Sequence, residues 1–246
     1  MTQPLQGRIA LVTGASRGIG RAAALAFARA GAHVVALART SGALEELDDE
    51  IRQIGGSATL VPLDLADVGG IEKLGPAVLE RWGKLDILLA NAGVLGSLSP
   101  LGHVTEADWA KVMDINVTAN WRLLKSLDPA LRASDAGRVI LLSSGAAHKC
   151  TAYWGPYSVS KAAVEALGRT YAAETATTPV KVTLVNPGPL RTRMRAEAMP
   201  GEDPATLKTP EDLAPHLVRL ASPDWAESGK IFDFPQSKLL APRMPA

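Results

Sequence analysis

Seven short apolar runs alternate with longer segments of helical pattern, and this alternation limits the possible folds more than any other feature. The runs span residues 8–13, 32–38, 57–63, 85–91, 137–144, 180–186 and 229–234. Most are apolar at nearly every position, which is typical of strands that are covered on both faces. The sequence therefore predicts repeated strand–helix units and an α/β fold. We expect a doubly wound parallel sheet of about seven strands, flanked by helices on both faces.

The composition is that of an ordinary globular protein, with 47% apolar residues, 21% charged residues and a net charge of +1. Such a chain has no basic excess to neutralise nucleic-acid phosphates. No apolar run approaches the length of a membrane span, and the first ten residues lack the apolar stretch of a signal peptide. Cys150 is the only cysteine, which favours a reducing compartment. We expect one domain over residues 1–246, located in the cytoplasm, with neither nucleic acid nor membrane as partner.

The stretch between Pro187 and Pro210 departs from the strand–helix alternation. It is rich in Pro, Arg and Met and contains only a short possible helix. The sequence predicts a mobile insertion at about residues 188–209.

A glycine-rich segment follows the first apolar run directly. Gly14, Gly18 and Gly20 have the spacing GxxxGxG, and an alanine-rich helical pattern begins there. Glycine lets the backbone N–H groups and the helix N-terminus approach an anion closely. Such turns also serve tight packing, but this turn belongs to the first strand–helix unit of an open α/β sheet. That position favours dinucleotide binding.

The end of the second run indicates which dinucleotide is preferred. NAD-binding folds commonly have an acidic side chain there, which binds the ribose hydroxyls. This chain has Ala38 and Arg39 instead, and Arg17 in the glycine-rich segment can approach the same place. Both arginines could simply be solvated, as most surface arginines are. Their charge nevertheless favours NADP(H), which carries a 2′-phosphate, with NAD(H) as the alternative.

Tyr157 and Lys161 are one turn apart if residues 157 onward form a helix, as their pattern indicates. A neighbouring ammonium group stabilises tyrosinate, so we expect Lys161 to lower the pKa of Tyr157 and make it a proton-transfer group. Tyr153 has no cation at the corresponding spacing.

These motifs together resemble the short-chain dehydrogenase/reductase family, over about residues 7–234 and in the family's order and spacing. "TGASRGIG", "NAG" at 91–93 and "YSVSK" carry the resemblance. It implies a Rossmann-like fold and cofactor contacts from Gly14, Ser16, Arg17, Gly18, Ile19, Gly20, Arg39, Asp64, Leu65, Asn91, Ala92, Gly93, Tyr157, Lys161, Pro187, Gly188 and Thr192.

The resemblance also implies a catalytic set of Asn116, Ser144, Tyr157 and Lys161. Tyr157 would be the general acid or base, Ser144 would bind the substrate oxygen, and Asn116 would hold a water that relays protons to Lys161. Ser143 is an alternative to Ser144, but the spacing and the opposite faces of adjacent strand residues favour Ser144. Asn116 considered alone could be a helix-surface or capping residue.

The family's activity implies an NADP(H)-dependent oxidoreductase that acts on a small-molecule carbonyl compound or secondary alcohol. A nucleotide-binding regulatory or scaffold protein without turnover is the alternative. The family also implies a homodimer or homotetramer, formed through helices at about residues 105–127 and 157–177. The Pro, Lys and Leu residues after Phe234 differ from the usual family ending and put tetramer contacts in doubt.

The substrate is the least constrained part of the prediction. His148, Tyr153 and Trp154 lie between Ser144 and Tyr157 and suggest a partly aromatic pocket. Arg191, Arg193 and Arg195 suggest an anionic substrate, although nearby acidic residues offset their charge. The four histidines show no pair at ligand spacing, so no metal site is predicted.

Overall fold

The computed structural model describes residues 3–242 and contains one sheet of eight strands. The strand order is β3-β2-β1-β4-β5-β6-β7-β8, and every pairing is parallel except that of β7 with β8. The predicted doubly wound α/β fold is confirmed. The strands are β1 Ile9–Thr13, β2 His33–Ala38, β3 Ser57–Pro62, β4 Ile87–Ala90, β5 Arg138–Leu142, β6 Lys181–Asn186, β7 Lys230–Asp233 and β8 Lys238–Leu240.

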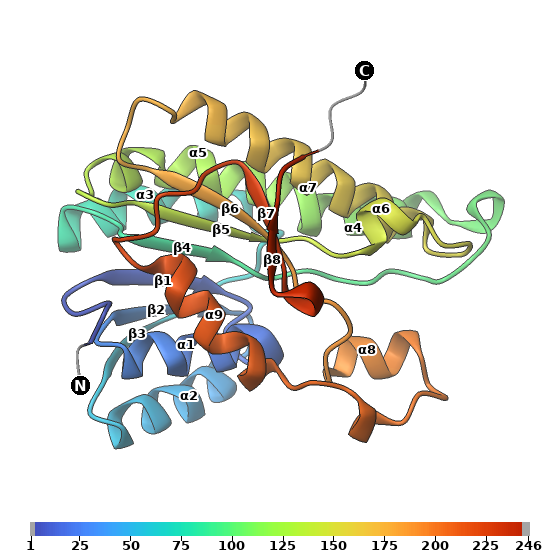
Figure 1. The fold of residues 1–246 in the computed structure, drawn as a ribbon, viewed down its shortest axis with the longest axis horizontal. Coiled ribbons are helices and arrows are strands. Elements are labelled where there is room, and N and C mark those ends of the chain that lie inside the picture. The colour runs from blue at the N-terminus through green and yellow to red at the C-terminus, as the bar shows by residue number, and fades with distance from the viewer. Residues whose placement is uncertain (1–2, 243–246) are drawn as a thin grey trace.

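Helices cover both faces of the sheet (Figure 1). Buried side chains of α1, α2 and α9 pack on one face, and those of α3, α5 and α7 on the other. A π-helix at Asp114–Thr118 joins α4 to α5. The helices are α1 Gly18–Arg29, α2 Ser41–Gln53, α3 Val68–Trp82, α4 Glu106–Met113, α5 Ala119–Arg132, α6 Ala146–Lys149, α7 Gly155–Glu174, α8 Arg193–Ala198 and α9 Pro210–Ala221, with 3₁₀ turns at Leu101–His103, Pro204–Thr206 and Phe234–Gln236.

Strand β8 was not predicted from the sequence. After β7, a 3₁₀ turn and Ser237 with a positive φ of 51° reverse the chain, and Lys238–Leu240 pair with β7 in antiparallel register. Three residues are too few for a periodic pattern, so a strand of this length has no clear signal in the sequence. Residues Lys238–Leu240, in the segment whose packing was in doubt, therefore extend the edge of the sheet, whereas residues 243–246 of that segment lie outside the described residues.

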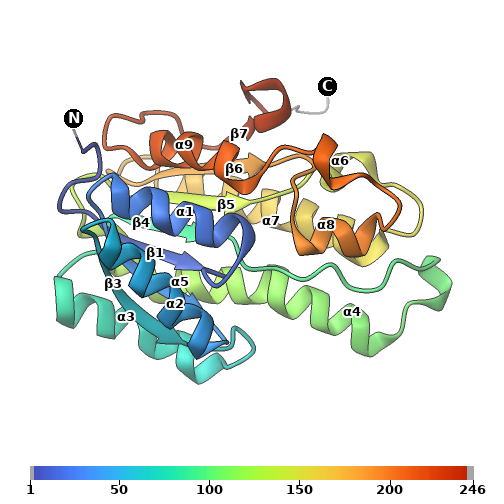
Figure 2. The same ribbon diagram turned by 90° about the horizontal axis from the view of Figure 1, so that it is seen from below.

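The predicted insertion at about residues 188–209 contains α8 and one 3₁₀ turn. A bridge between Leu190 and Lys208 joins its two ends, and the amide of Arg191 donates to the carbonyl of Lys208 at 2.8 Å. Figure 2 shows α8 at the same end of the molecule as α6. The insertion thus lies beyond the carboxyl ends of the strands.

Hydrogen bonds between the ends of β1 and β4 join two segments that are far apart in the sequence. The amides of Asn91 and Ala92 both donate to Thr13 Oγ1 at 3.0 Å, and Asn91 Nδ2 donates to the Thr13 carbonyl at 2.9 Å. The carboxyl edge of the sheet is therefore held together by side chains as well as by the strand pairing.

Gly75 provides a test of the packing between α3 and α5. A Cβ atom added there would lie 1.8 Å from the Ser126 carbonyl oxygen. Because that oxygen belongs to the backbone of α5, we predict that Gly75→Ala lowers the free energy of unfolding by about 1–3 kcal/mol or more, measured by urea denaturation.

Gly42→Ala is the control, since a Cβ at this glycine of α2 would meet nothing within 4 Å. Alanine is the better helix former, so this variant should be stabilised by about 0.5–1 kcal/mol. Equal effects of the two substitutions would contradict the close packing of α3 on α5.

Candidate active site

The turn from β1 into α1 brings backbone groups unusually close together. Gly14 has a φ of 66° and Gly18 a φ of 56°. A Cβ atom at Gly20 would lie 2.3 Å from the Gly14 carbonyl oxygen, so no larger residue fits there without a backbone shift. The N-terminus of α1 is consequently open to an anion, as the glycine spacing predicts.

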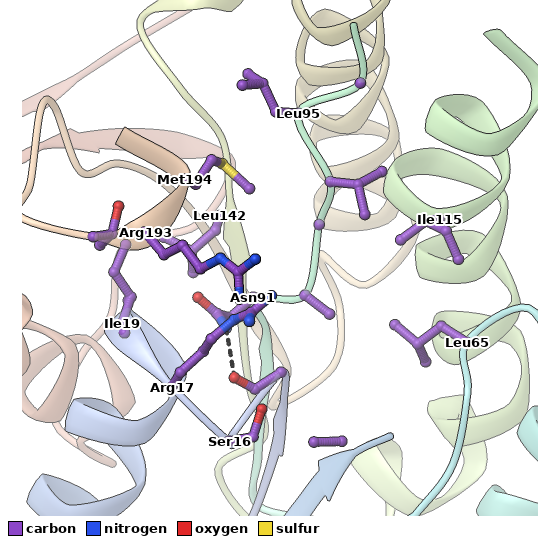
Figure 3. A pocket seen from close by; sticks show the side chains of 18 of the residues that line it. Ser16, Arg17, Ile19, Leu65, Asn91, Leu95, Ile115, Leu142, Arg193 and Met194 are labelled. Carbon is purple, nitrogen blue, oxygen red and sulfur yellow. Dashed lines mark hydrogen bonds between the residues drawn. The ribbon is translucent and has the colours of Figure 1, made fainter. Parts of the chain in front are cut away.

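A cavity of about 1050 Å³ extends along the carboxyl edge of the sheet, from this turn to Tyr157 and Lys161 on α7. All but two of the predicted cofactor residues line it; Gly20 lies within the turn and Gly188 packs against Pro235. Figure 3 shows Arg193 and Met194 of α8 on the opposite side of this cavity from Ile115. The size of the cavity and the glycine turn in its wall fit a dinucleotide.

Arg39 lies directly after β2, at the end of the cavity remote from Tyr157. Its Nη1 is 3.8 Å from Asp64 Oδ2, and the two side chains are 65% and 46% exposed. A long, exposed ion pair contributes little free energy, so Arg39 can turn towards a phosphate group. Arg17, also exposed, lines the same cavity.

Tyr157 and Lys161 are both buried on one face of α7. Lys161 Nζ donates to the Leu142 carbonyl at 2.8 Å and lies 5.6 Å from the centre of the Tyr157 ring. Burial lowers the pKa of Lys161 to about 8. The helical prediction that places the two side chains together is thus correct.

The predicted lowering of the Tyr157 pKa is wrong for the protein by itself. Burial raises the pKa of the phenol, and a hydrogen bond with Ser144 opposes that effect only in part. Lys161 does not reverse it, because burial disfavours its own charged form and its Nζ is hydrogen-bonded to a carbonyl of β5. The phenol is therefore held in its protonated form.

Asn116 is fully buried in the π-helix. Its Oδ1 accepts from the amide of Val94 at 2.8 Å, and its Nδ2 donates to the Val94 carbonyl at 2.9 Å and to Ser160 Oγ at 3.0 Å. A Cβ atom at Gly93 would lie 3.2 Å from Asn116 Oδ1 and 3.6 Å from Lys161 Nζ. Asn116 is therefore no surface or capping residue, and it lies next to Lys161.

The two serines after β5 differ as the strand alternation predicts. Ser144 is half-buried, and its hydroxyl lies near the Tyr157 phenol and lowers the pKa of that phenol. Ser143 is buried, and its Oγ donates to Glu165 on α7. Ser143 is nevertheless the one that lines the cavity. The structure thus brings Ser144, rather than Ser143, to the phenol.

The predicted aromatic pocket is only partly present. Trp154 packs edge-on to Tyr157, with ring centres 6.0 Å apart, but Tyr153 is 60% exposed and has a positive φ of 73°. Neither these two residues nor His148 lines the cavity. Its walls include apolar side chains that the sequence analysis did not identify, because they carry no motif: Leu95, Leu98, Ile115 and Met194.

The basic residues of the insertion are largely neutralised by acidic neighbours. Arg193 Nε donates to Glu197 at 2.8 Å, and Arg195 forms two hydrogen bonds with Glu202. Arg191 and Arg193 line the cavity. These ion pairs weaken the hypothesis of an anionic substrate.

No group of three or more potential metal ligands occurs within residues 3–242. In the same range, no helix combines the length and the apolarity that crossing a membrane requires.

Comparisons with known proteins agree with this geometry. A family model described as short chain dehydrogenase matches residues 8–203. The chain is 37% identical over 233 residues to YciK of Escherichia coli K12, named an uncharacterized oxidoreductase, with 93% of this chain and 92% of the relative covered. It is 36% identical over 210 residues to an uncharacterized NAD-dependent oxidoreductase of Mycobacterium tuberculosis, covering 79% and 76%. A short chain dehydrogenase from Shigella flexneri, solved in complex with NADP, superposes with a TM-score of 0.91 at 38% identity, covering 95% of this chain and 99% of that one.

The buried Lys161 gives the stability a characteristic pH dependence. Its pKa is about 8 in the folded protein and near 10.5 in the unfolded chain. Between these values the unfolded chain binds more protons, so the lysine makes the free energy of unfolding rise with pH, by up to about 1.4 kcal/mol per unit. Lys161→Met removes this contribution, so its stability relative to wild type should decline between about pH 8 and pH 10.5.

Urea denaturation of both proteins at several pH values measures this difference. Lys73→Met replaces an exposed lysine on α3 and should show no such trend. A difference between Lys161→Met and wild type that is constant with pH would contradict the lowered pKa.

Proposed function

The chain belongs to the short-chain dehydrogenase/reductase family, and we propose that it is an NADP(H)-dependent enzyme that interconverts a small-molecule carbonyl compound and a secondary alcohol, with Tyr157 as general acid and base. The observation that carries the proposal is the position of Tyr157. Its phenol lies near Ser144 and beside Lys161, in a cavity that also reaches the glycine turn.

The chemistry divides between the cofactor and the protein. The nicotinamide, when bound, supplies or accepts the hydride, so the protein must position the carbonyl and move one proton. In the reducing direction Tyr157 donates its proton to the substrate oxygen, and the raised pKa of the phenol keeps that proton available at neutral pH. Ser144 donates a hydrogen bond to the same oxygen and stabilises the charge that develops there.

Lys161 and Asn116 support the proton transfer. With a pKa of about 8, Lys161 can accept and release a proton close to neutral pH. Both amide hydrogens of Asn116 are used by Val94 and Ser160, so a relay water would bind the free lone pair of Asn116 Oδ1, next to Gly93. In this proposal Asn116 mainly fixes the backbone at Val94.

The preference for NADP(H) is supported by Arg17 and Arg39, which line the cavity where no acidic residue follows β2. The NADP bound to the Shigella flexneri protein also supports it. The Mycobacterium tuberculosis relative is named NAD-dependent, so NAD(H) is the alternative.

We propose that residues 1–246 act as one NAD(P)-binding domain, with the insertion at about residues 188–209 as its substrate loop. We also propose a homodimer or homotetramer. In support, Trp121 of α5 and Val159 of α7 are apolar and 49% and 43% exposed, on the two helices expected to form the interface.

The catalytic role of Tyr157 predicts a loss of turnover without a loss of cofactor binding. Tyr157→Phe removes the transferable proton, so turnover should fall by about 10²–10⁴-fold while the Kd for NADPH stays within about twofold of wild type. A panel of ketones, aldehydes and secondary alcohols, assayed with NADPH or NADP⁺, measures the first effect and fluorescence titration the second. If NADPH binds but no compound reacts faster with wild type than with the Phe variant, the protein is a binding module without turnover.

The role of Arg39 predicts a change in the choice of cofactor. Arg39→Ala should raise the Kd for NADPH about tenfold, the effect of one charge-assisted hydrogen bond, and change the Kd for NADH much less. Arg52→Ala is the control, because this exposed arginine of α2 pairs with Asp48 and does not line the cavity. Tighter binding of NADH than of NADPH by the wild-type protein would contradict the proposed preference.

A further inference from the structure

Three successive residues at the end of β5 each interact with a side chain from a different turn of α7. Lys161 donates to the Leu142 carbonyl at 2.8 Å, and Glu165 accepts from Ser143 Oγ at 2.5 Å. The hydroxyl of Ser144 lies near the Tyr157 phenol and lowers its pKa. Residues 157, 161 and 165 are spaced four apart, so all three lie on one face of the helix. Glu165 therefore belongs to the same row as the proposed catalytic pair.

The carboxylate of Glu165 is almost completely buried. Its side chain is 6% exposed, and its second oxygen, Oε2, is 2.9 Å from His148 Nε2. A buried carboxylate is unfavourable unless it is hydrogen-bonded, and an apolar side chain of similar size often gives equal or greater stability. Stability alone therefore does not account for a carboxylate at this position.

The two partners of Glu165 lie on either side of Ser144 in the sequence. Ser143 precedes it, and His148 lies on α6, which begins two residues after Ser144. The amide of Ala146, the first residue of α6, donates to Ser144 Oγ at 3.2 Å. The carboxylate of Glu165 thus contacts both Ser143, which precedes Ser144, and His148 of α6, the helix that follows Ser144.

We propose that Glu165 is a positioning residue, which holds Ser144 beside the Tyr157 hydroxyl through its contacts with Ser143 and His148. The inference rests on the proposed function, since the consequence for catalysis requires that Ser144 and Tyr157 act on a carbonyl oxygen. In this proposal each of the three aligned residues of α7 has its own role. Tyr157 transfers the proton, Lys161 assists that transfer, and Glu165 sets the position of Ser144.

Replacement of Glu165 by Leu tests the proposal, because Leu fills a similar space without accepting hydrogen bonds. Glu165→Leu should lower kcat for a carbonyl substrate about tenfold or more, and leave the Kd for NADPH within about twofold of wild type. Glu165→Gln retains one acceptor oxygen, so its kcat should lie between those of the Leu variant and wild type. Glu174→Leu, at the exposed end of the same helix, is the matched control and should not change kcat.

A spectroscopic measurement makes the test independent of turnover. The chain has three tyrosines, at 153, 157 and 171, so labelling with 3-fluorotyrosine gives fluorine signals that Tyr→Phe variants assign. Glu165→Leu should displace Ser144 and thereby move the Tyr157 signal, whereas Glu174→Leu should leave that signal in place, with Tyr171 as the internal reference. If wild type turns over no substrate, the proposed function fails, and the Tyr157 signal still decides the role of Glu165.

Removal of the two partners of Glu165 provides a second route, in case Glu165→Leu does not fold. Ser143→Ala removes the hydrogen bond to Glu165 Oε1, and His148→Gln removes the imidazole contact with Glu165 Oε2. Because the His148 side chain is 65% exposed, it can be replaced without disturbing the core. The double variant should show the loss of kcat and the moved Tyr157 signal. An unchanged kcat and an unchanged Tyr157 signal, in Glu165→Leu or in the double variant, would overturn the proposal.

Discussion

The parallel pairing of β1, β4, β5 and β6 is the constraint on which the rest of the structure depends. Parallel neighbours end at the same edge of a sheet, so residues that follow different strands meet there. The glycine turn after β1, Asn91 after β4, Ser144 after β5 and Pro187 after β6 all come together in this way. The hydrogen bonds from the amides of Asn91 and Ala92 to Thr13 Oγ1 also link the ends of β1 and β4 to each other.

Helix α7 adds a second constraint, because it packs on one face of the sheet and buries three polar side chains against the end of β5. Lys161 and Glu165 are 4% exposed as whole residues, and each is satisfied by a different residue at the end of β5. Burial of such groups lowers stability unless their partners are well placed. Stability alone therefore does not explain two buried ionisable side chains at this end of α7.

Much of this arrangement could be predicted from residues that carry a motif or a period. The seven apolar runs became β1–β7 because strands covered on both faces leave a strong apolar pattern. The different surroundings of Ser143 and Ser144 could be predicted because strand residues alternate in direction. Strand β8 and the π-helix at Asn116 were missed, since neither a three-residue strand nor one widened helical turn has a distinct pattern.

The sequence by itself determined the α/β class, the glycine turn and the spacing of Tyr157 and Lys161, because these depend on local pattern and on helical geometry. Only the tertiary structure decided the electrostatics of the site. Burial raises the pKa of Tyr157, opposite to the expectation from its neighbour Lys161, and burial is a property of the packed chain. The tertiary structure also brought Glu165 to Ser143 and His148, and gave the cavity apolar walls where the sequence suggested aromatic ones. Contacts between residues so far apart in the chain exist only once the strands and helices have packed.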